Sequence, residues 1–158
     1  MSIFVKSTLA PKPRSKESSN IAIFFAAVLV LMAVAQLFTF EDFLPYIQSL
    51  NLPLSDNGVY SVAPILIFAE IFAVPFLLRM RLSPAFRFVS MLLGWLSVGI
   101  WLFISVWILV ANVDVDTIGF LGTVVDLTPG WWAVFISLAL GVLAAWSAWG
   151  LWPGKRTK

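Results

Sequence analysis

The sequence contains no cysteine and no histidine among its 158 residues. Without thiols the chain has no thiol redox chemistry, and without imidazoles it lacks the commonest acid–base catalyst and metal ligand. Charge is also scarce, because Asp, Glu, Lys and Arg together make up 11% of the chain. Hydrophobic residues reach 61%, and the mean hydropathy is +0.98. This composition leaves too little charged surface for a soluble domain and indicates an integral membrane protein.

Four apolar runs are long enough to cross a bilayer as helices. They cover approximately residues 20–38, 59–79, 87–111 and 130–152. About 20 apolar residues span a hydrocarbon core, and the need to pair every backbone polar group there favours helices. We therefore expect an all-α, polytopic membrane domain over 20–152, with four transmembrane helices in an antiparallel bundle. Residues 1–19 and 153–158 are predicted to be tails.

Basic residues are absent from two of the three connections between these runs. All ten lie before the first run, between the second and third, or after the fourth: Lys6, Lys12, Arg14, Lys16, Arg79, Arg81, Arg87, Lys155, Arg156 and Lys158. The loops at 39–58 and 112–129 carry only acidic charge. By the positive-inside rule, we predict a bacterial inner-membrane protein with both termini cytoplasmic and both acidic loops extracytoplasmic. Clustering at the membrane surface also argues against nucleic acid as a partner.

The first apolar run could instead be a signal peptide, and the second acidic loop could instead bind a metal ion. Ala33-Val34-Ala35, near the end of the first run, resembles a signal-peptidase site. The run is long for a signal peptide, so we favour a retained helix. Asp114, Asp116 and Asp126 offer oxygen ligands of the kind that Ca²⁺ prefers. Their spacing does not match an EF-hand, so we favour a solvated acidic loop and predict no metal site.

Two further segments are predicted to contact lipid. Hydrophobic residues recur at helical spacing over 40–51, which indicates a short amphipathic helix at the outer interface. Arg79, Arg81 and Arg87 belong to the short connection between the second and third runs, where they are candidates to bind anionic lipid headgroups.

Small residues form a stripe on each of the last two runs. The third run carries Ser90, Gly94, Ser97 and Ser105 together with Trp101, and the fourth carries Ser137, Gly141, Ala145 and Ala148. Small residues let helices approach closely, and hydroxyls can hydrogen-bond across the contact. We interpret both stripes as helix-packing surfaces, with a ligand groove along the seam as the alternative.

Glu70 is the only charged residue away from the ends of the four runs. It lies roughly 12 Å along a helix from Leu78, at a depth where an exposed carboxylate is costly. We therefore expect a neutral Glu70 that hydrogen-bonds to protein. Ser97, Trp95 and Trp146 lie at comparable depths and are its predicted partners.

Gln36 is a poorer candidate, because it lies nearer the outer end of its run. Three roles are compatible with Glu70: a structural hydrogen-bond node, a contact with another subunit or a bound headgroup, and a proton-carrying or catalytic group. The third is disfavoured because no second titratable residue is evident beside it. Pro75, in the same run, is expected to free a backbone carbonyl near residue 71 and to kink the helix.

This layout resembles the DoxX-like and MauE-like family of small bacterial membrane proteins. The resemblance lies in Phe40-x-x-Phe43-x-x-Tyr46, Leu50-Asn51-Leu52-Pro53, Ala69-Glu70-Ile71 and the basic turn from Arg79 to Arg87. It covers about residues 20–110 and implies a four-helix bundle associated with membrane redox or maturation systems. Residues 116–122 lack the paired cysteines that MauE-like members carry, which excludes disulfide transfer. Gln36 stands where DoxX-like members often place a basic residue.

We expect a non-catalytic integral subunit or accessory factor of a larger cytoplasmic-membrane complex, because hardly any of the chain lies outside the membrane to host a reaction. Membrane lipids and other membrane protein subunits are the expected partners. The alternative is a redox-associated or quinone-interacting protein that uses Glu70 and the nearby Trp residues. No cofactor is predicted, although bound lipid or quinone is compatible with the sequence. A transporter component is disfavoured, because there is one intramembrane acid and no visible inverted repeat.

Overall fold

The computed structural model describes residues 8–152, which form five α-helices: α1 (Lys16–Phe38), α2 (Phe40–Ser49), α3 (Asp56–Leu77), α4 (Pro84–Val110) and α5 (Trp131–Gly150). All except α2 are long and apolar enough to cross a membrane. The prediction of an all-α fold with four helices that could span a membrane is therefore confirmed. The predicted tail at 153–158 and the first seven residues of the tail at 1–19 lie outside the described residues.

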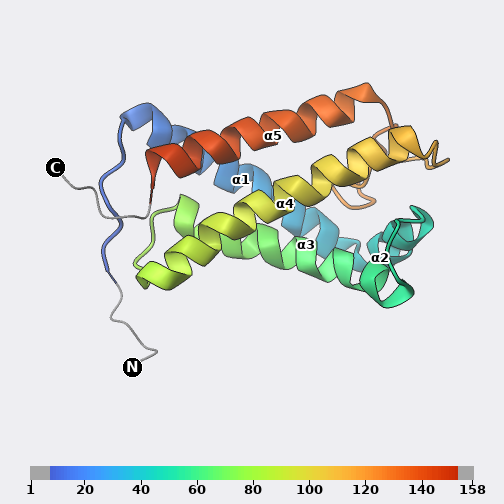
Figure 1. Cartoon of the computed structure of the whole chain (residues 1–158), viewed down its shortest axis with the longest axis horizontal. Helices are drawn as coiled ribbons and strands as arrows, with labels where there is room; N and C mark the ends of the chain where they lie inside the picture. Colours follow the sequence, from blue (N-terminus) through green and yellow to red (C-terminus); the bar gives the residue numbers. More distant parts are fainter. Residues whose placement is uncertain (1–7, 153–158) are drawn as a thin grey trace.

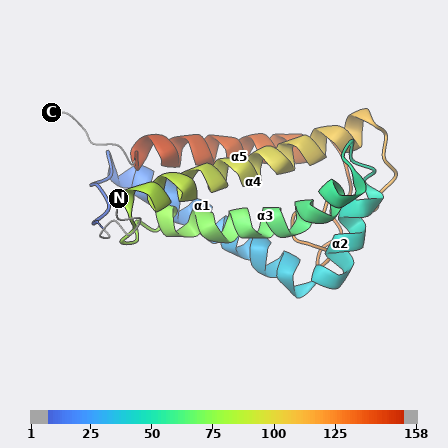
Figure 2. The ribbon, with the colours of Figure 1, turned by 60° about the horizontal axis from the view of Figure 1, so that its bottom comes forward.

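The four long helices lie side by side along the longest axis of the molecule (Figure 1). Helices α1 and α4 each pack against both α3 and α5, so the contacts close into a ring. One end of the bundle holds the described N-terminal segment, the turn between α3 and α4 and the end of α5. The opposite end holds α2 and the connection 111–130 (Figure 2). The buried side chains of the four long helices therefore meet along one central axis.

Serine caps explain where three of the long helices begin. The Ser15 hydroxyl accepts a hydrogen bond from the Ser18 backbone N–H, and Ser18 reciprocates, forming a capping box at the start of α1. Ser55 and Ser83 cap α3 and α4, and Pro84 occupies the first position of α4. The predicted starts near 20, 59 and 87 come late, because these capping turns are polar and lie outside the apolar runs.

Ser90 joins α4 to α3 next to Pro75, which lies inside α3. The Ser90 hydroxyl accepts a 3.2 Å hydrogen bond from the Phe76 backbone N–H and donates to the Phe72 carbonyl. The two backbone groups are four residues apart and are ordinary helix partners. The Ser90 hydroxyl therefore stabilises the α3 backbone where Pro75 interrupts its hydrogen bonding. The carbonyl that it binds belongs to Phe72, one residue beyond residue 71, whose carbonyl Pro75 is expected to free.

The small-residue stripe of α4 is buried along its whole length, from Ser90 to Ser105. On α5, Ser137 is buried, and its hydroxyl lies 3.0 Å from that of Ser105 across the contact. Gly141 is half-buried, and a Cβ on it would lie 3.7 Å from Val98.

Ala145 is exposed, so its assignment to the packing surface is wrong. Each step of four residues turns a helix by roughly 40° beyond a full revolution, so two such steps from Ser137 leave the seam. The buried positions instead alternate steps of four and three, as Ala133, Ser137, Leu140, Ala144 and Ser147 do.

Candidate functional site

The carboxyl group of Glu70 lies at the centre of the bundle, and its side chain is 0% exposed. Three donors converge on its Oε1 atom. Trp101 Nε1 donates at 2.9 Å, Gln36 Nε2 at 3.3 Å and Ser97 Oγ at 3.4 Å. We call these four residues the Glu70 node. Because Gln36 belongs to α1 and Ser97 and Trp101 to α4, the node ties three helices together.

Helix geometry and small neighbours explain why the node fits. Ser97 and Trp101 are four residues apart, so they project from one face of α4 towards α3. One turn earlier on that face lies Gly94, where a Cβ would come 3.5 Å from the Cβ of Ala73. This close approach of α3 and α4 lets the Ser97 hydroxyl and the Trp101 indole both reach one carboxyl oxygen.

Two oxygen atoms of the node, Glu70 Oε2 and Gln36 Oε1, are buried and without a hydrogen bond in the described part of the chain. They belong to side chains that already share the bond from Gln36 Nε2 to Glu70 Oε1. A carboxylic acid and a primary amide can pair reciprocally, with the acid O–H donating to the amide oxygen. A neutral Glu70 with its proton on Oε2 would satisfy both oxygens, whereas a carboxylate would leave both unpaired.

Positive charge does not compensate Glu70 either. Within residues 8–152, no Lys or Arg side chain is hydrogen-bonded or ion-paired to it, and its three donors are all neutral. An ionised carboxylate without a cation is costly in an apolar interior. The contacts therefore suit an uncharged group that holds helices together.

The connection between α4 and α5 closes the node at the end of the bundle that holds α2, which we label the outer end. The Phe120 carbonyl accepts a 3.2 Å hydrogen bond from Gln36 Nε2, and the Phe120 ring packs on Trp101 with centroids 4.6 Å apart. The Tyr46 hydroxyl of α2 donates to the Ile118 carbonyl at 2.6 Å. Because Ile118 and Phe120 are buried, the expectation of a solvated loop is wrong for this part. We call residues 117–122 the outer plug.

Two glycines shape the outer plug. Gly119 has φ +76°, and a Cβ on it would lie 2.4 Å from Cε1 of Tyr46. Gly122 has φ +58°, and a Cβ there would lie 2.3 Å from the Thr39 hydroxyl. Both positions combine a left-handed backbone with a close approach, which only glycine accepts without strain. Burial raises the pKa of the Tyr46 phenol, so this hydroxyl holds the plug as a neutral donor.

The structure places only some of the predicted partners at Glu70. Ser97 lies in the node, whereas Trp95 and Trp146 face outwards with 42% and 47% of their surface exposed. Their assignment to the buried node is therefore wrong, while a contact with a partner stays a prediction. Trp101 supplies the indole instead. Its place four residues after Ser97 on one stripe was the available signal.

The prediction that Gln36 is a poor candidate is wrong, since Gln36 donates directly to Glu70. Counting residues from one end of each run does not give comparable depths on different helices, because the four helices differ in length. Gln36 was recognisable as the only amide side chain well inside the first apolar run.

The three arginines of the basic turn differ in environment. Arg79 and Arg81 are exposed, and their contact with lipid headgroups stays a prediction. Arg87 is 5% exposed and donates to the Thr8 and Leu82 carbonyls at 2.8 and 3.4 Å, so its assignment to headgroups is wrong. Thr8 pairs with Leu82 in an isolated β-bridge, and Arg87 fastens this N-terminal segment to the turn.

Within the described residues, no cluster of three or more His, Cys, Asp and Glu side chains is arranged to hold a metal ion. Searches for similar protein families, curated proteins and solved structures found no match to this chain.

Proposed function

We propose that the chain is an integral, non-catalytic subunit or accessory factor of a larger cytoplasmic-membrane complex. The outward face of α4 is the observation that carries this proposal. It bears a shallow, open apolar hollow of about 730 Å³, lined only by α4 side chains from Val89 to Phe103. Gly99 lies in this hollow, where an added Cβ would meet nothing within 4 Å. A helix surface that is recessed at a glycine can accept the ridge of side chains on a partner helix.

Trp95 lines the same hollow, and its indole N–H donates no hydrogen bond within residues 8–152. Lipid tails offer no acceptor at membrane depth, whereas a hydroxyl or free carbonyl of a partner helix does. The hollow and the unpaired donor therefore both favour a protein neighbour on α4.

Enclosure of Glu70 supports the absence of catalysis. The carboxyl group is fully buried, its bonded oxygen is surrounded by donors of the same chain, and the outer plug lies over it. A reacting group must come within hydrogen-bond reach of its substrate, and this packing leaves no such approach. We assign Glu70 a structural role that keeps α1, α3 and α4 in register.

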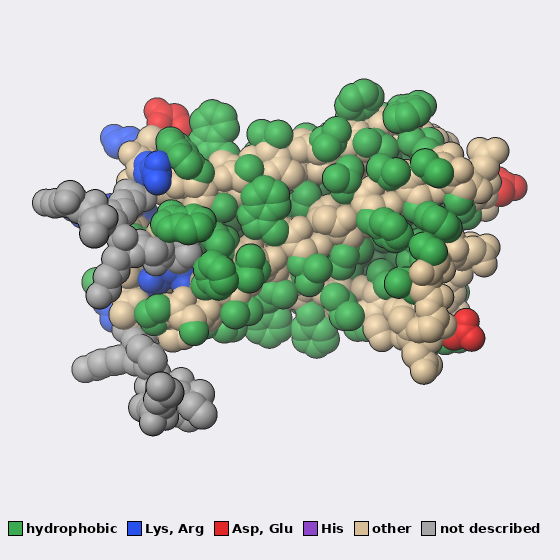
Figure 3. Space-filling view, viewed as in Figure 1, with side chains coloured by type: hydrophobic (Ala, Val, Ile, Leu, Met, Phe, Trp, Pro, Cys, Tyr) green, Lys and Arg blue, Asp and Glu red, His purple; other side chains and the backbone are tan. Residues whose placement is uncertain are grey.

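We further infer that the long helices form an antiparallel bundle in a bacterial inner membrane, with both termini cytoplasmic. In the described part, Lys and Arg gather at the end that holds the α3–α4 turn, whereas the opposite end carries only acidic charge (Figure 3). This separation of charge supports the orientation through the positive-inside rule.

The test is extraction from native membranes in a mild detergent, followed by native mass spectrometry. We expect a partner in stoichiometric amount. Gly99→Trp, which fills the hollow, should release it, whereas Val142→Trp on the exposed face of α5 should retain it. Recovery of the wild-type chain without any protein partner would overturn the proposal.

A quinone-interacting, redox-associated role is the second candidate, in keeping with the resemblance to DoxX-like proteins. It would require the outer plug to move, because the aromatic pair of Trp101 and Phe120 beside Glu70 is buried. Recovery of a lone chain with bound quinone in the same experiment would support this candidate.

A further inference from the structure

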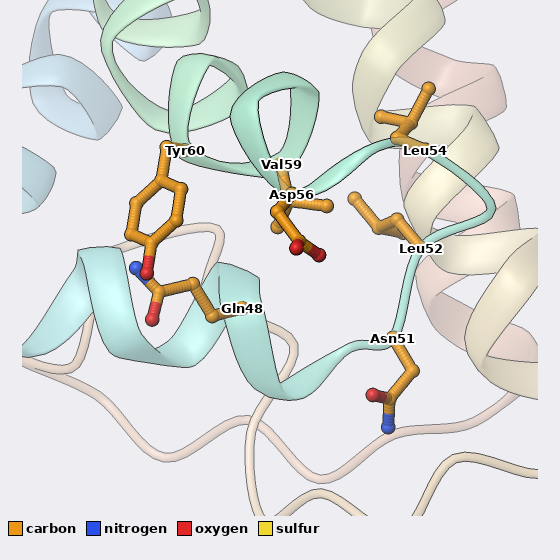
Figure 4. Close-up of a pocket in the computed structure, with 7 residues that line it drawn as sticks. All are labelled: Gln48, Asn51, Leu52, Leu54, Asp56, Val59 and Tyr60. Atoms are coloured by element: carbon orange, nitrogen blue, oxygen red, sulfur yellow. The ribbon is translucent and has the colours of Figure 1, made fainter.

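Two hollows lie along the contact between α2 and α3. The first, which we call the outer hollow, has a volume of about 370 Å³ (Figure 4). Its polar lining consists of Gln48, Asn51, Asp56 and Tyr60. The second, the apolar groove, has a volume of about 210 Å³ and is lined by Leu37, Phe40, Pro64, Ile67, Phe68 and Ile71. One hollow is thus lined with polar groups and the other only with hydrocarbon.

Helix spacing places the two hollows end to end. Tyr60 lines the outer hollow, and Ile67 and Ile71 line the apolar groove. Ile67 follows Tyr60 by seven residues and Ile71 follows it by eleven, which is close to two and three full turns, so the three residues share one face of α3. On α2, Gln48 lines the hollow, and Phe40, about two turns earlier, lines the groove. One face of α3 therefore leads from a polar end at the membrane surface to an apolar end within the span.

We propose that the outer hollow and the apolar groove together bind one phospholipid with an ammonium headgroup. The headgroup would occupy the hollow, and an acyl chain would follow α3 into the groove. This site is separate from the α4 face on which the proposed function rests. It also lies at the opposite end of the bundle from Arg79 and Arg81, the residues predicted to bind anionic headgroups.

Charge selects the headgroup. Among the described residues, Asp56 alone is charged in the lining of the outer hollow, and its carboxylate points into it (Figure 4). The described residues at this end of the bundle carry Asp and Glu but no Lys or Arg, so an anionic headgroup would be repelled while an ammonium would be attracted. Gln48 and Tyr60 extend towards each other in Figure 4. Both offer N–H or O–H donors for the phosphate and ester oxygens of the same lipid.

Headgroup preference can be measured by native mass spectrometry of the purified protein with equal amounts of phosphatidylethanolamine and phosphatidylglycerol of identical chains. We expect one phosphatidylethanolamine to bind roughly fivefold more tightly, the upper range for one exposed charge pair. Asp56→Asn should abolish this preference, whereas Asp126→Asn, an exposed acid of the other outer loop, should retain it. Equal binding of both lipids by the wild type, or equal effects of the two variants, would overturn the proposal.

Asp56 also favours the first turn of α3 electrostatically, so Asp56→Asn can weaken the fold itself. Gln48→Glu provides the complementary test, because a second carboxylate in the hollow should increase the preference for phosphatidylethanolamine. No increase in a folded Gln48→Glu protein would count against the site.

The acyl-chain part has its own test. Ile71→Trp should fill the apolar groove and lower the binding of both lipids equally, while Leu138→Trp on the exposed face of α5 should leave it unchanged. A groove-filling variant that binds lipid as the wild type does would exclude this path. If an uncharged quinone at equal concentration displaces bound phosphatidylethanolamine, the site does not select its ligand by the headgroup, and the proposal is overturned.

Discussion

The Trp101 indole donates a 2.9 Å hydrogen bond to Glu70 Oε1, and both side chains are 0% exposed. This bond crosses from α4 to α3 at the centre of the bundle. The ring that supplies it also supports Phe120 of the outer plug. One indole therefore links helix packing in the span to the loop that closes its outer end.

Trp101→Phe removes the N–H donor and leaves a gap beside Phe120. We expect a loss of about 2–4 kcal/mol in the free energy of unfolding, from the lost bond and the gap together. Circular dichroism during thermal unfolding in detergent measures the change. Trp95→Phe is the matched control, since that indole faces outwards and should change stability by less than about 0.5 kcal/mol. Similar losses in both variants would contradict the assignment of Trp101 to the node.

Ser90→Ala should destabilise the bundle by about 1–3 kcal/mol, because the Phe76 N–H would lose a buried partner beside Pro75. Ser147→Ala is the control. Within residues 8–152 the Ser147 hydroxyl is buried without a hydrogen bond, so its removal should be neutral or slightly stabilising. The same melting experiment compares the two. A larger loss in Ser147→Ala than in Ser90→Ala would refute the support of α3 by Ser90.

Gly119→Ala should displace the outer plug, because the new Cβ would need a left-handed backbone and the space of the Tyr46 ring. Strain of this kind costs about 1–3 kcal/mol. Hydrogen exchange should accelerate over residues 117–122 while the long helices stay protected. Gly99→Ala, with open space around its Cβ, should stabilise α4 by up to about 1 kcal/mol. Unchanged exchange in Gly119→Ala would argue against a closed plug.

Orientation in the membrane can be tested cleanly, because the chain has no cysteine. Arg81→Cys in the basic turn and Asp126→Cys in the acidic loop each introduce one exposed thiol. In spheroplasts, an impermeant maleimide should label the thiol at position 126, whereas the thiol at 81 should react only after the membrane is broken. The reverse pattern would place the termini outside.

Hydropathy was sufficient to predict the four long helices, because length and apolar composition are local properties of a segment. The partners of Glu70 depend on helix rotation and register, which a single sequence does not determine. Depth counting thus missed Gln36 and Trp101 and favoured Trp95 and Trp146. It found Ser97, which lies on α4, the helix joined to α3 by a short turn.

The environments of two other groups also depended on the tertiary fold. The acidic loop contains two glycines and looks solvated, but the fold brings Phe120 over Trp101 and buries it. Arg87 looks like its exposed neighbours Arg79 and Arg81 in the sequence, yet it is buried against the Thr8 carbonyl. In both cases the contact joins segments far apart in the chain, which local patterns do not reveal.

The structural role of Glu70 is tested most directly by comparing the unfolding free energies of Glu70→Gln and Glu70→Ala. A glutamine keeps an acceptor for Trp101 and Ser97 and can pair reciprocally with the Gln36 amide, as a protonated glutamate would. Glu70→Gln should therefore stay within about 1 kcal/mol of the wild type, while Glu70→Ala should lose about 2–4 kcal/mol by leaving buried donors unpaired. A glutamine variant as unstable as the alanine variant would contradict the neutral, structural Glu70.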